Sequence, residues 1–326
     1  AGSWGTTFAK VVADNPENEV TLWARRADVA EEINDDHRNG DYLPGINLPQ
    51  NLKASTDVAA VLEGAEQVYL SLPSHPLRAN MEEWGPLLPS KAILVSLMKG
   101  VEKDTGLRMS EVIAQVTGFA AAQIAVVSGP NLSLEIAAEQ PTASVAASQS
   151  QETASAVAHA ASNSYFTTFT NTDVIGTEFG GILKNLIAVA IGIVNGVGYG
   201  ENTKASIMTR GLAEISRFAV AYGAQAQTMV GLAGLGDLIA TSESPLSRNH
   251  KAGEMLGKGY TLKEVKKRMS QTAEGLASVA PILQLAAAKN VSMPIVEQVQ
   301  GVLDGTMKPR DIAPHLTHET DGPKGE

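Results

Sequence analysis

The sequence predicts two dissimilar halves: an α/β half with a mostly parallel sheet, followed by an all-α half. The first half alternates short β-rich runs with helical stretches, and the second half holds long helical patterns with no convincing strand between them. The change of pattern falls near Asn171. We therefore expect a domain of residues 1–171, a helical domain of residues 172–316 and a flexible tail of residues 317–326.

A glycine turn opens the chain. Gly2-Ser3-Trp4-Gly5 leads into an apolar helical pattern that ends near Asp14-Asn15-Pro16. Such a turn presents free backbone N–H groups, and the positive end of a helix, to a pyrophosphate, as in a Rossmann-like dinucleotide fold. The complete pattern G-x-G-x-x-G needs a further glycine before Ala1 and a strand before that, so we expect the first strand of the sheet to be missing from this chain. Alone, the four residues fit an ordinary glycine turn equally well.

The next β-rich run, residues 19–23, is followed by Arg25 and Arg26. In a dinucleotide fold, an acidic residue at this place favours a free ribose 2′-hydroxyl, whereas arginine accommodates a 2′-phosphate. The two arginines therefore favour NADP(H), with NAD(H) as a possible cofactor. The alternative interpretation is the solvated start of a helix.

Further β-rich runs cover residues 67–72, 92–97, 124–128, 142–147 and 166–170. The first three end in turn-forming or polar segments, namely Pro73-Ser74-His75-Pro76, Lys99-Gly100 and Gly129-Pro130-Asn131. Open α/β sheets bind ligands beyond the carboxyl ends of their strands, so these three tips predict one crevice. Lys99 can reach an anion or a carbonyl there, although a surface lysine in a loop is the alternative.

In the second half, helical patterns cover residues 175–194, 206–222, 262–269, 274–289 and 294–303. Lys184 is surrounded by apolar residues on nearly every face of the first of these. A lysine in that setting either extends to the surface or is desolvated, and desolvation lowers its pKa as proton transfer requires. We interpret Lys184 as a functional residue.

Two later segments carry polar groups. Ser247-Arg248-Asn249 offers a hydroxyl, a guanidinium and an amide in succession, which suits a phosphate clamp, although a capped helix start with an exposed arginine is equally compatible. Gly234-Leu235-Gly236-Asp237 follows no strand, so it is not a second dinucleotide loop.

The composition excludes several functional classes. The formal net charge of −10 argues against nucleic acid or an anionic membrane as the main partner. There is no cysteine, which excludes disulfides, thiolate zinc sites and cysteine nucleophiles and fits the cytoplasm. The six histidines and the carboxylates show no metal-ligand spacing, so no metal site is expected. The longest apolar run, residues 186–194, is too short for a stable membrane insertion.

Taken together, these segments resemble the bacterial-type NAD(P)-dependent glycerol-3-phosphate dehydrogenases over nearly the whole chain. Each motif is common, but their order and spacing are specific. The resemblance is carried by Gly2-Ser3-Trp4-Gly5-Thr6, Tyr42-Leu43-Pro44-Gly45, Pro73-Ser74-His75, Lys99-Gly100, Ser128-Gly129-Pro130, Gly180-Gly181-Ile182-Leu183-Lys184-Asn185, Thr209-Arg210-Gly211-Leu212, residues 231–238, Ser247-Arg248-Asn249 and Glu274-Gly275.

The resemblance implies reversible reduction of dihydroxyacetone phosphate to sn-glycerol 3-phosphate, which feeds glycerophospholipid synthesis, and Lys184 as the general acid/base. Cofactor contacts would come from Ser3, Trp4, Arg25, Arg26, Tyr42, Lys99, Ser133, Arg248, Thr272 and Glu274. The small phosphorylated substrate would be held by Lys99, Gly129, Asn131, Lys184, Asp237, Ser247, Arg248 and Asn249. Asn131 stands where the family often has Ser or Thr, and its amide can still donate a hydrogen bond. We also expect a cytoplasmic homodimer.

Two other interpretations stay open at this point. The 3-hydroxyacid and 6-phosphogluconate dehydrogenases also join a dinucleotide domain to helices and use a lysine. A cofactor-binding sensor without turnover is the second, because the glycine motif is incomplete. Oxidation of NADPH on addition of dihydroxyacetone phosphate distinguishes an enzyme from a sensor.

Overall fold

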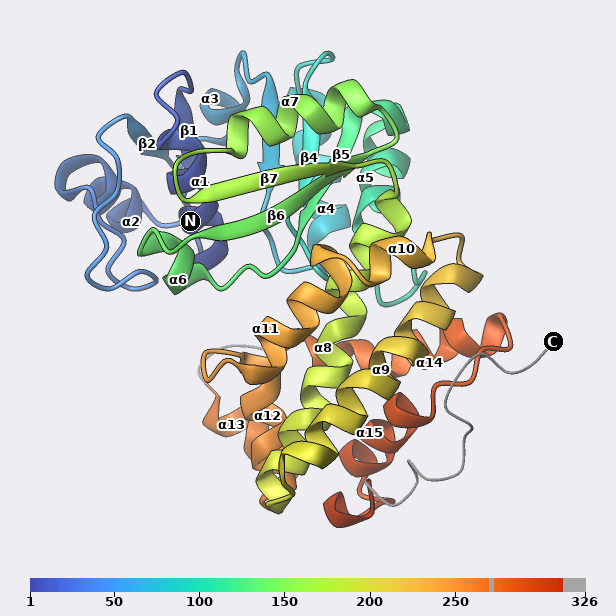
Figure 1. The fold of residues 1–326 in the computed structure, drawn as a ribbon. Helices are drawn as coiled ribbons and strands as arrows, with labels where there is room; N and C mark the ends of the chain where they lie inside the picture. Colours follow the sequence, from blue (N-terminus) through green and yellow to red (C-terminus); the bar gives the residue numbers. More distant parts are fainter. Residues whose placement is uncertain (270–272, 313–326) are drawn as a thin grey trace.

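The computed structural model describes residues 1–269 and 273–312, and in Figure 1 an α/β part lies above an all-helical part. The predicted fold class is confirmed. The strands of the α/β part are β1 (Val20–Trp23), β2 (Leu52–Ser55), β3 (Gln67–Leu70), β4 (Ile93–Ser96), β5 (Ile124–Ser128), β6 (Thr142–Ser148) and β7 (Phe166–Asn171). Its helices are α1 (Ser3–Ala13), α2 (Ala27–Glu31), α3 (Val58–Leu62), α4 (Leu77–Trp84), α5 (Met109–Thr117), α6 (Ser133–Ala137) and α7 (Gln151–Ala161).

The strands form two separate ladders. One is the parallel pair β1–β2, and the other has the order β3-β4-β5-β6-β7. Within the second ladder only the β5–β6 pairing is antiparallel. Both β1 and β3 line a cavity of about 600 Å³ between the ladders, at the place where the glycine motif predicts the first strand of the sheet. The sheet is therefore mostly parallel, as expected, and interrupted at that place.

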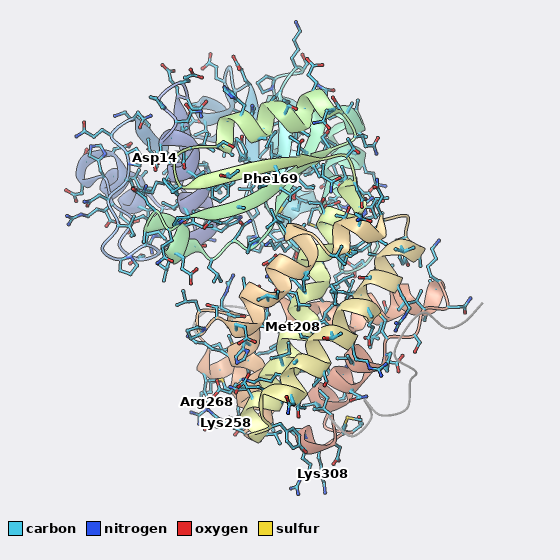
Figure 2. All side chains as sticks on the ribbon, viewed as in Figure 1. Asp14, Phe169, Met208, Lys258, Arg268 and Lys308 are labelled. Carbon is cyan, nitrogen blue, oxygen red and sulfur yellow. The ribbon has the colours of Figure 1, made fainter. Side chains whose placement is uncertain are left out.

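The sequence analysis did not predict β2. Its four residues, Leu-Lys-Ala-Ser, include three with a low preference for strands, although Leu52 and Ala54 do alternate inward. At the far end of the second ladder, β7 is an edge strand. Its side chain Phe169 is 54% exposed and lies in front of the sheet in Figure 2, while α7 covers β6 and β7 in Figure 1.

In residues 173–269 and 273–312 the second half consists of helices joined by turns and loops, with no strand in those ranges. Its helices are α8 (Val174–Val197), α9 (Glu201–Ala221), α10 (Ala226–Met229), α11 (Asp237–Glu243), α12 (Arg248–Gly257), α13 (Leu262–Arg268), α14 (Glu274–Ala288) and α15 (Pro294–Asp304). The predicted tail of residues 317–326 and the predicted domain end at residue 316 lie outside the described residues.

Helix α8 is the centre of the helical part. Its N-terminus is capped by Asp173, whose carboxylate accepts a hydrogen bond from Gly176 N–H at 2.8 Å. By length and hydropathy α8 could span a membrane, but 83% of its most apolar window is buried inside the protein, which identifies it as a core helix. Helix α12 packs directly on it, because a Cβ at Gly192 would lie 2.2 Å from the carbonyl oxygen of His250.

A buried carboxylate joins α9 to α15. Glu214 is 1% exposed, and it accepts hydrogen bonds from the backbone N–H groups of Ile295 at 3.0 Å and Val296 at 3.1 Å, in the first turn of α15. Burial raises the pKa of Glu214 to about 7, and the two hydrogen bonds oppose that rise only in part.

This shift predicts a pH-dependent stability. Between the unfolded pKa of 4.5 and about 7, the folded protein binds more protons at Glu214 than the unfolded chain does, so this residue makes stability fall as pH rises through that interval. Glu214→Gln removes the contribution, at most about 1.4 kcal/mol per pH unit. Denaturant unfolding of both proteins from pH 5 to pH 8 measures it, and parallel curves would contradict the assignment.

Candidate functional site

The site lies where three parallel strand ends meet the helical part. Because β3, β4 and β5 are neighbours and parallel, the segments that follow them lie at one edge of the sheet, as predicted. The segments after β3 and β4 are in close contact, since a Cβ at Gly100 would lie 2.5 Å from Ser74 Oγ. His75 is exposed in the first of these loops.

Two lysines from the two halves share one carboxylate. Asp237, at the start of α11, is 1% exposed. Its Oδ2 lies 2.6 Å from Lys99 Nζ, which follows β4, and its Oδ1 lies 3.0 Å from Lys184 Nζ on α8. Lys99 also donates to the carbonyl oxygen of Gly129 at 3.0 Å, so the tips of β4 and β5 are tied together.

Close packing makes this arrangement possible. At Gly181, one turn before Lys184, a Cβ would lie 2.5 Å from Ser128 Oγ at the end of β5 and 3.3 Å from the side-chain carbons of Lys99. A larger residue would have to displace the Ser128 hydroxyl and crowd the Lys99 side chain. The glycine therefore lets the Lys99 side chain pass close to α8.

Lys184 is desolvated, as the sequence predicts. Its side chain is 8% exposed, and it donates to the hydroxyl of Thr241, which itself donates to Asp237 Oδ1 at 3.2 Å. Burial lowers the pKa of Lys184 to about 8, helped by the positive charges of Lys99 and Arg248 and opposed by Asp237. The amine can thus exchange a proton near neutral pH.

Thr241 was not predicted from the sequence. It lies four residues after Asp237, on the same face of α11, and that spacing is the signal that could have identified it.

The Ser247-Arg248-Asn249 segment begins α12. Ser247 is the N-cap, and its hydroxyl accepts from His250 N–H at 3.2 Å, which bears out the capped-helix interpretation. Arg248 is exposed, and it makes no hydrogen bond or ion pair within residues 1–269 and 273–312. Asn249 is engaged: its amide donates to Asn185 Oδ1 at 2.8 Å and its oxygen accepts from Gly275 N–H at 3.0 Å.

Glu274 and Asn131 complete this side of the site. Burial raises the pKa of Glu274, while Arg248, Lys184 and Lys99 act against that rise, so these charges lie near one another. Asn131 Oδ1 is buried without a hydrogen-bond partner in the described part of the chain, and its amide nitrogen lies 3.5 Å from Ser144 Oγ.

The N-terminus of α1 has the properties of a pyrophosphate-binding site. Its N-cap is Gly2, no side chain caps it, and its first turn has no acidic residue. The indole Nε1 of Trp4 is buried and has no partner among the residues described. Ser133 begins α6 beside this helix, since Thr7 Oγ1 donates to its carbonyl oxygen at 3.3 Å.

The two arginines after β1 differ. Arg26 forms ion pairs with Asp41 at 2.6 Å and with Asp28 at 3.2 Å. Arg25 is exposed and forms no ion pair with any residue of the described ranges. Tyr42, next to Asp41, is 38% exposed. Thr272, another predicted cofactor contact, lies outside the described residues.

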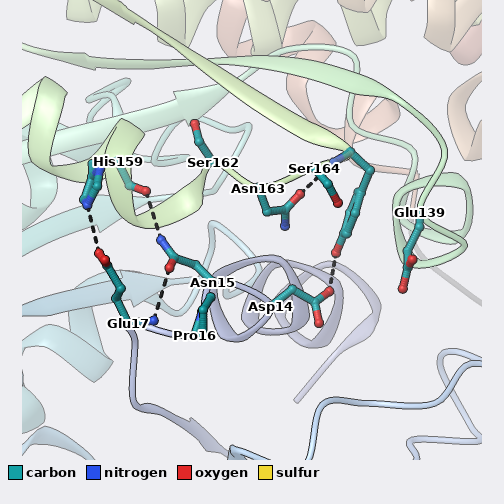
Figure 3. Close-up of a pocket in the computed structure, with 10 residues that line it drawn as sticks. Asp14, Asn15, Pro16, Glu17, Glu139, His159, Ser162, Asn163 and Ser164 are labelled. Carbon is teal, nitrogen blue, oxygen red and sulfur yellow. Dashed lines mark hydrogen bonds and ion pairs between the residues drawn. The ribbon is translucent and has the colours of Figure 1, made fainter.

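A second cavity, of about 540 Å³, lies at the other end of α1, and Asp14, Glu139 and His159 are among the residues that line it (Figure 3). Its acidic groups already have partners. Lys10 binds Asp14 at 2.6 Å and Glu139 at 2.9 Å, and His159 lies 3.4 Å from Glu17. We assign it no role in the chemistry of the lysine pair.

Comparison with known proteins gives consistent matches along the chain. The family model described as NAD-dependent glycerol-3-phosphate dehydrogenase N-terminus matches residues 1–154, and the corresponding C-terminus model matches residues 173–314. A glycerol-3-phosphate dehydrogenase [NAD(P)+] of Leifsonia xyli is 65% identical over 100% of this chain and 88% of its own length. One of Corynebacterium glutamicum is 52% identical over 96% of this chain and 94% of its own length.

Solved structures agree with these matches. The crystal structure of glycerol-3-phosphate dehydrogenase from Coxiella burnetii has a TM-score of 0.90 at 34% identity, covering 98% of this chain and 97% of that one. The enzyme from Saccharomyces cerevisiae has a TM-score of 0.86 at 27% identity, covering 98% of each chain.

The charges around Lys184 predict its titration. We expect its amine to titrate near pH 8, and Asp237→Asn to lower that pKa further, because the carboxylate stabilises the ammonium form. NMR of ¹³C-labelled lysine side chains across pH 6–11 measures both values. A Lys184 that titrates near 10.5 would contradict the assignment, as would a pKa that rises in the variant.

Proposed function

This chain belongs to the NAD-dependent glycerol-3-phosphate dehydrogenases, the oxidoreductases that interconvert dihydroxyacetone phosphate and sn-glycerol 3-phosphate, and we propose that Lys184 is its general acid/base. The enzyme is of the bacterial NAD(P)-dependent type. The observation that carries the proposal is the buried arrangement of Lys184, Asp237 and Lys99 between the strand tips and α11. The family models that match this chain are those of the glycerol-3-phosphate dehydrogenases, and not those of the 3-hydroxyacid or 6-phosphogluconate dehydrogenases.

The chemistry follows from the charges. When a carbonyl carbon is reduced, negative charge develops on its oxygen, and a nearby ammonium stabilises that charge and donates a proton to it. In the oxidation direction the neutral amine of Lys184 accepts the hydroxyl proton. A pKa of about 8 leaves both protonation states accessible near neutral pH.

We propose that the substrate lies between the strand tips and α12. Arg248, exposed and without a hydrogen bond or ion pair among the described residues, would bind the phosphate group together with Ser247 and Asn249. Lys99 and the Gly129–Asn131 segment would hold the carbonyl end, and Asp237 would keep both lysines in place. The unpartnered oxygen of Asn131 supports this role, because a buried polar atom without a partner costs free energy.

The residues at the edge of the sheet fit a dinucleotide. The uncapped N-terminus of α1 and the unpartnered indole of Trp4 support a pyrophosphate there. Ser3, Trp4, Tyr42 and Ser133 would hold the cofactor on the sheet side. Lys99, Arg248, Thr272 and Glu274 would hold it at the helical side. When bound, the nicotinamide supplies or accepts the hydride.

We propose a preference for NADP(H), with NAD(H) as a second cofactor. Arg25 and Arg26 support it, because a guanidinium binds a 2′-phosphate. A role in feeding glycerophospholipid synthesis is consistent with the enzyme's product. The cytoplasmic location and the homodimer stay predictions.

Replacing Lys184 tests the catalytic proposal. Lys184→Ala is expected to lower kcat by about 10²–10⁴-fold, because general acid–base catalysis contributes that much, while NADPH still binds. Steady-state rates with dihydroxyacetone phosphate and NADPH fluorescence measure the two effects.

Lys10→Met is the matched control for this variant. Lys10 is also a buried lysine paired with carboxylates, but it lies in the last turn of α1, at the end opposite the proposed pyrophosphate site. Lys10→Met should therefore leave kcat unchanged. A near-normal kcat in Lys184→Ala would refute the role. Binding of NADPH without oxidation by the wild-type protein would instead favour a sensor.

Replacing the arginines tests the cofactor preference. Arg25→Ala is expected to raise KM for NADPH about tenfold and to leave KM for NADH nearly unchanged, because only NADPH carries the 2′-phosphate. Arg26→Ala should have the smaller effect, since Arg26 is already paired with two carboxylates. Equal effects of Arg25→Ala on both cofactors would contradict the proposal.

A further inference from the structure

A second buried carboxylate lies at the junction of the two halves, and the proposed chemistry does not use it. Glu178, in the first turns of α8, is 4% exposed. Its Oε2 accepts from Arg108 Nη1 and from Ser110 Oγ, both at 2.5 Å, and its Oε1 accepts from the backbone N–H of Ser110 at 3.0 Å. Glu178 therefore binds the N-terminal turn of α5 in the sheet half.

The same turn of α5 is linked to Lys99. The chain leaves β4, passes Lys99 and forms a β-bridge between Val101 and Arg108 before α5 begins. Two more hydrogen bonds close this loop, from Glu102 N–H to the carbonyl of Leu107 and from Gly106 N–H to the carbonyl of Glu102, both at 2.8 Å. Arg108 thus connects Glu178 to the segment that carries Lys99.

We propose that Glu178 is a positioning residue: by fixing Arg108 and Ser110 against α8, it holds Lys99 at the correct distance from Asp237 and Lys184. The inference rests on the proposed function of these lysines. Glu178 and Lys184 are six residues apart on one helix, about 9 Å along its axis. Between them Gly181 packs against the Lys99 side chain, so α8 meets the Lys99 segment along this whole stretch.

The chemistry of the Glu178 contacts favours a role in fixing geometry over a role in holding the two halves together. A buried carboxylate costs free energy that its partners largely offset, so apolar residues of similar size could hold the halves together at least as well. Hydrogen bonds to a carboxylate, unlike apolar contacts, fix direction and distance. Without Glu178, Lys99 keeps its own bonds to Asp237 and Gly129 but loses the support of its loop.

Glu178→Gln tests the proposal. We expect kcat to fall 10–100-fold, the size of effect that a misplacement of about 1 Å produces. We also expect Lys184 to titrate at a higher pH in the unliganded protein, since a displaced Lys99 no longer lowers its pKa. Ser110→Ala, which removes one bond to Glu178 and keeps the ion pair, should show the same changes to a smaller extent. If Glu178→Gln does not fold, Ser110→Ala alone tests the proposal.

Glu214→Gln is the matched control. Glu214 is also a buried carboxylate that binds the first turn of a helix through backbone N–H groups, but it lies between α9 and α15. It should alter stability while kcat and the titration of Lys184 stay unchanged.

The outcomes separate this inference from the proposed function. If Lys184→Ala is inactive but Glu178→Gln and Ser110→Ala keep wild-type kcat and Lys184 titration, Glu178 has no positioning role and the catalytic assignment stands. A loss of stability in Glu178→Gln with no change in either readout would also overturn the proposal. An active Lys184→Ala contradicts the catalytic assignment itself.

Discussion

The site depends on one interaction, the Asp237 carboxylate between Lys99 and Lys184. The two ammonium groups repel each other, and burial penalises that of Lys184. A single carboxylate within 3.0 Å of both offsets the repulsion and joins three segments distant in sequence: the end of β4, the middle of α8 and the start of α11. The sheet half and the helical half thus meet at a charged centre.

That centre requires α8 to be rigid and close to the sheet. Helix α8 is apolar along most of its length, its N-terminus is fixed by Asp173, and α12 approaches it at Gly192. Lys184 is buried on this helix. The same packing that stabilises the helical half therefore desolvates Lys184 and lowers its pKa.

The features that the sequence predicted correctly are those that depend on a local pattern of residues. The six β-rich runs became strands, and an apolar helix with a single lysine indicated Lys184. What it missed depends on contacts between distant segments. The sequence does not show that Arg26 pairs with Asp41, that Thr241 meets Lys184, or that Glu178 meets Arg108. Strand β2 was missed because its residues have weak strand preferences, and it exists through its pairing with β1.

The charges at the junction have opposite effects on the pKa of Lys184. Asp237 alone would raise the pKa of Lys184 and keep the amine protonated, which suits reduction but hinders the reverse step. Lys99 and Arg248 act in the opposite direction, and burial does most of the lowering. The net result, a pKa of about 8, depends on the distance of each charge from Lys184. Contacts that hold Lys99 in place, including those beyond the reacting atoms, therefore help to set the acidity of the catalytic amine.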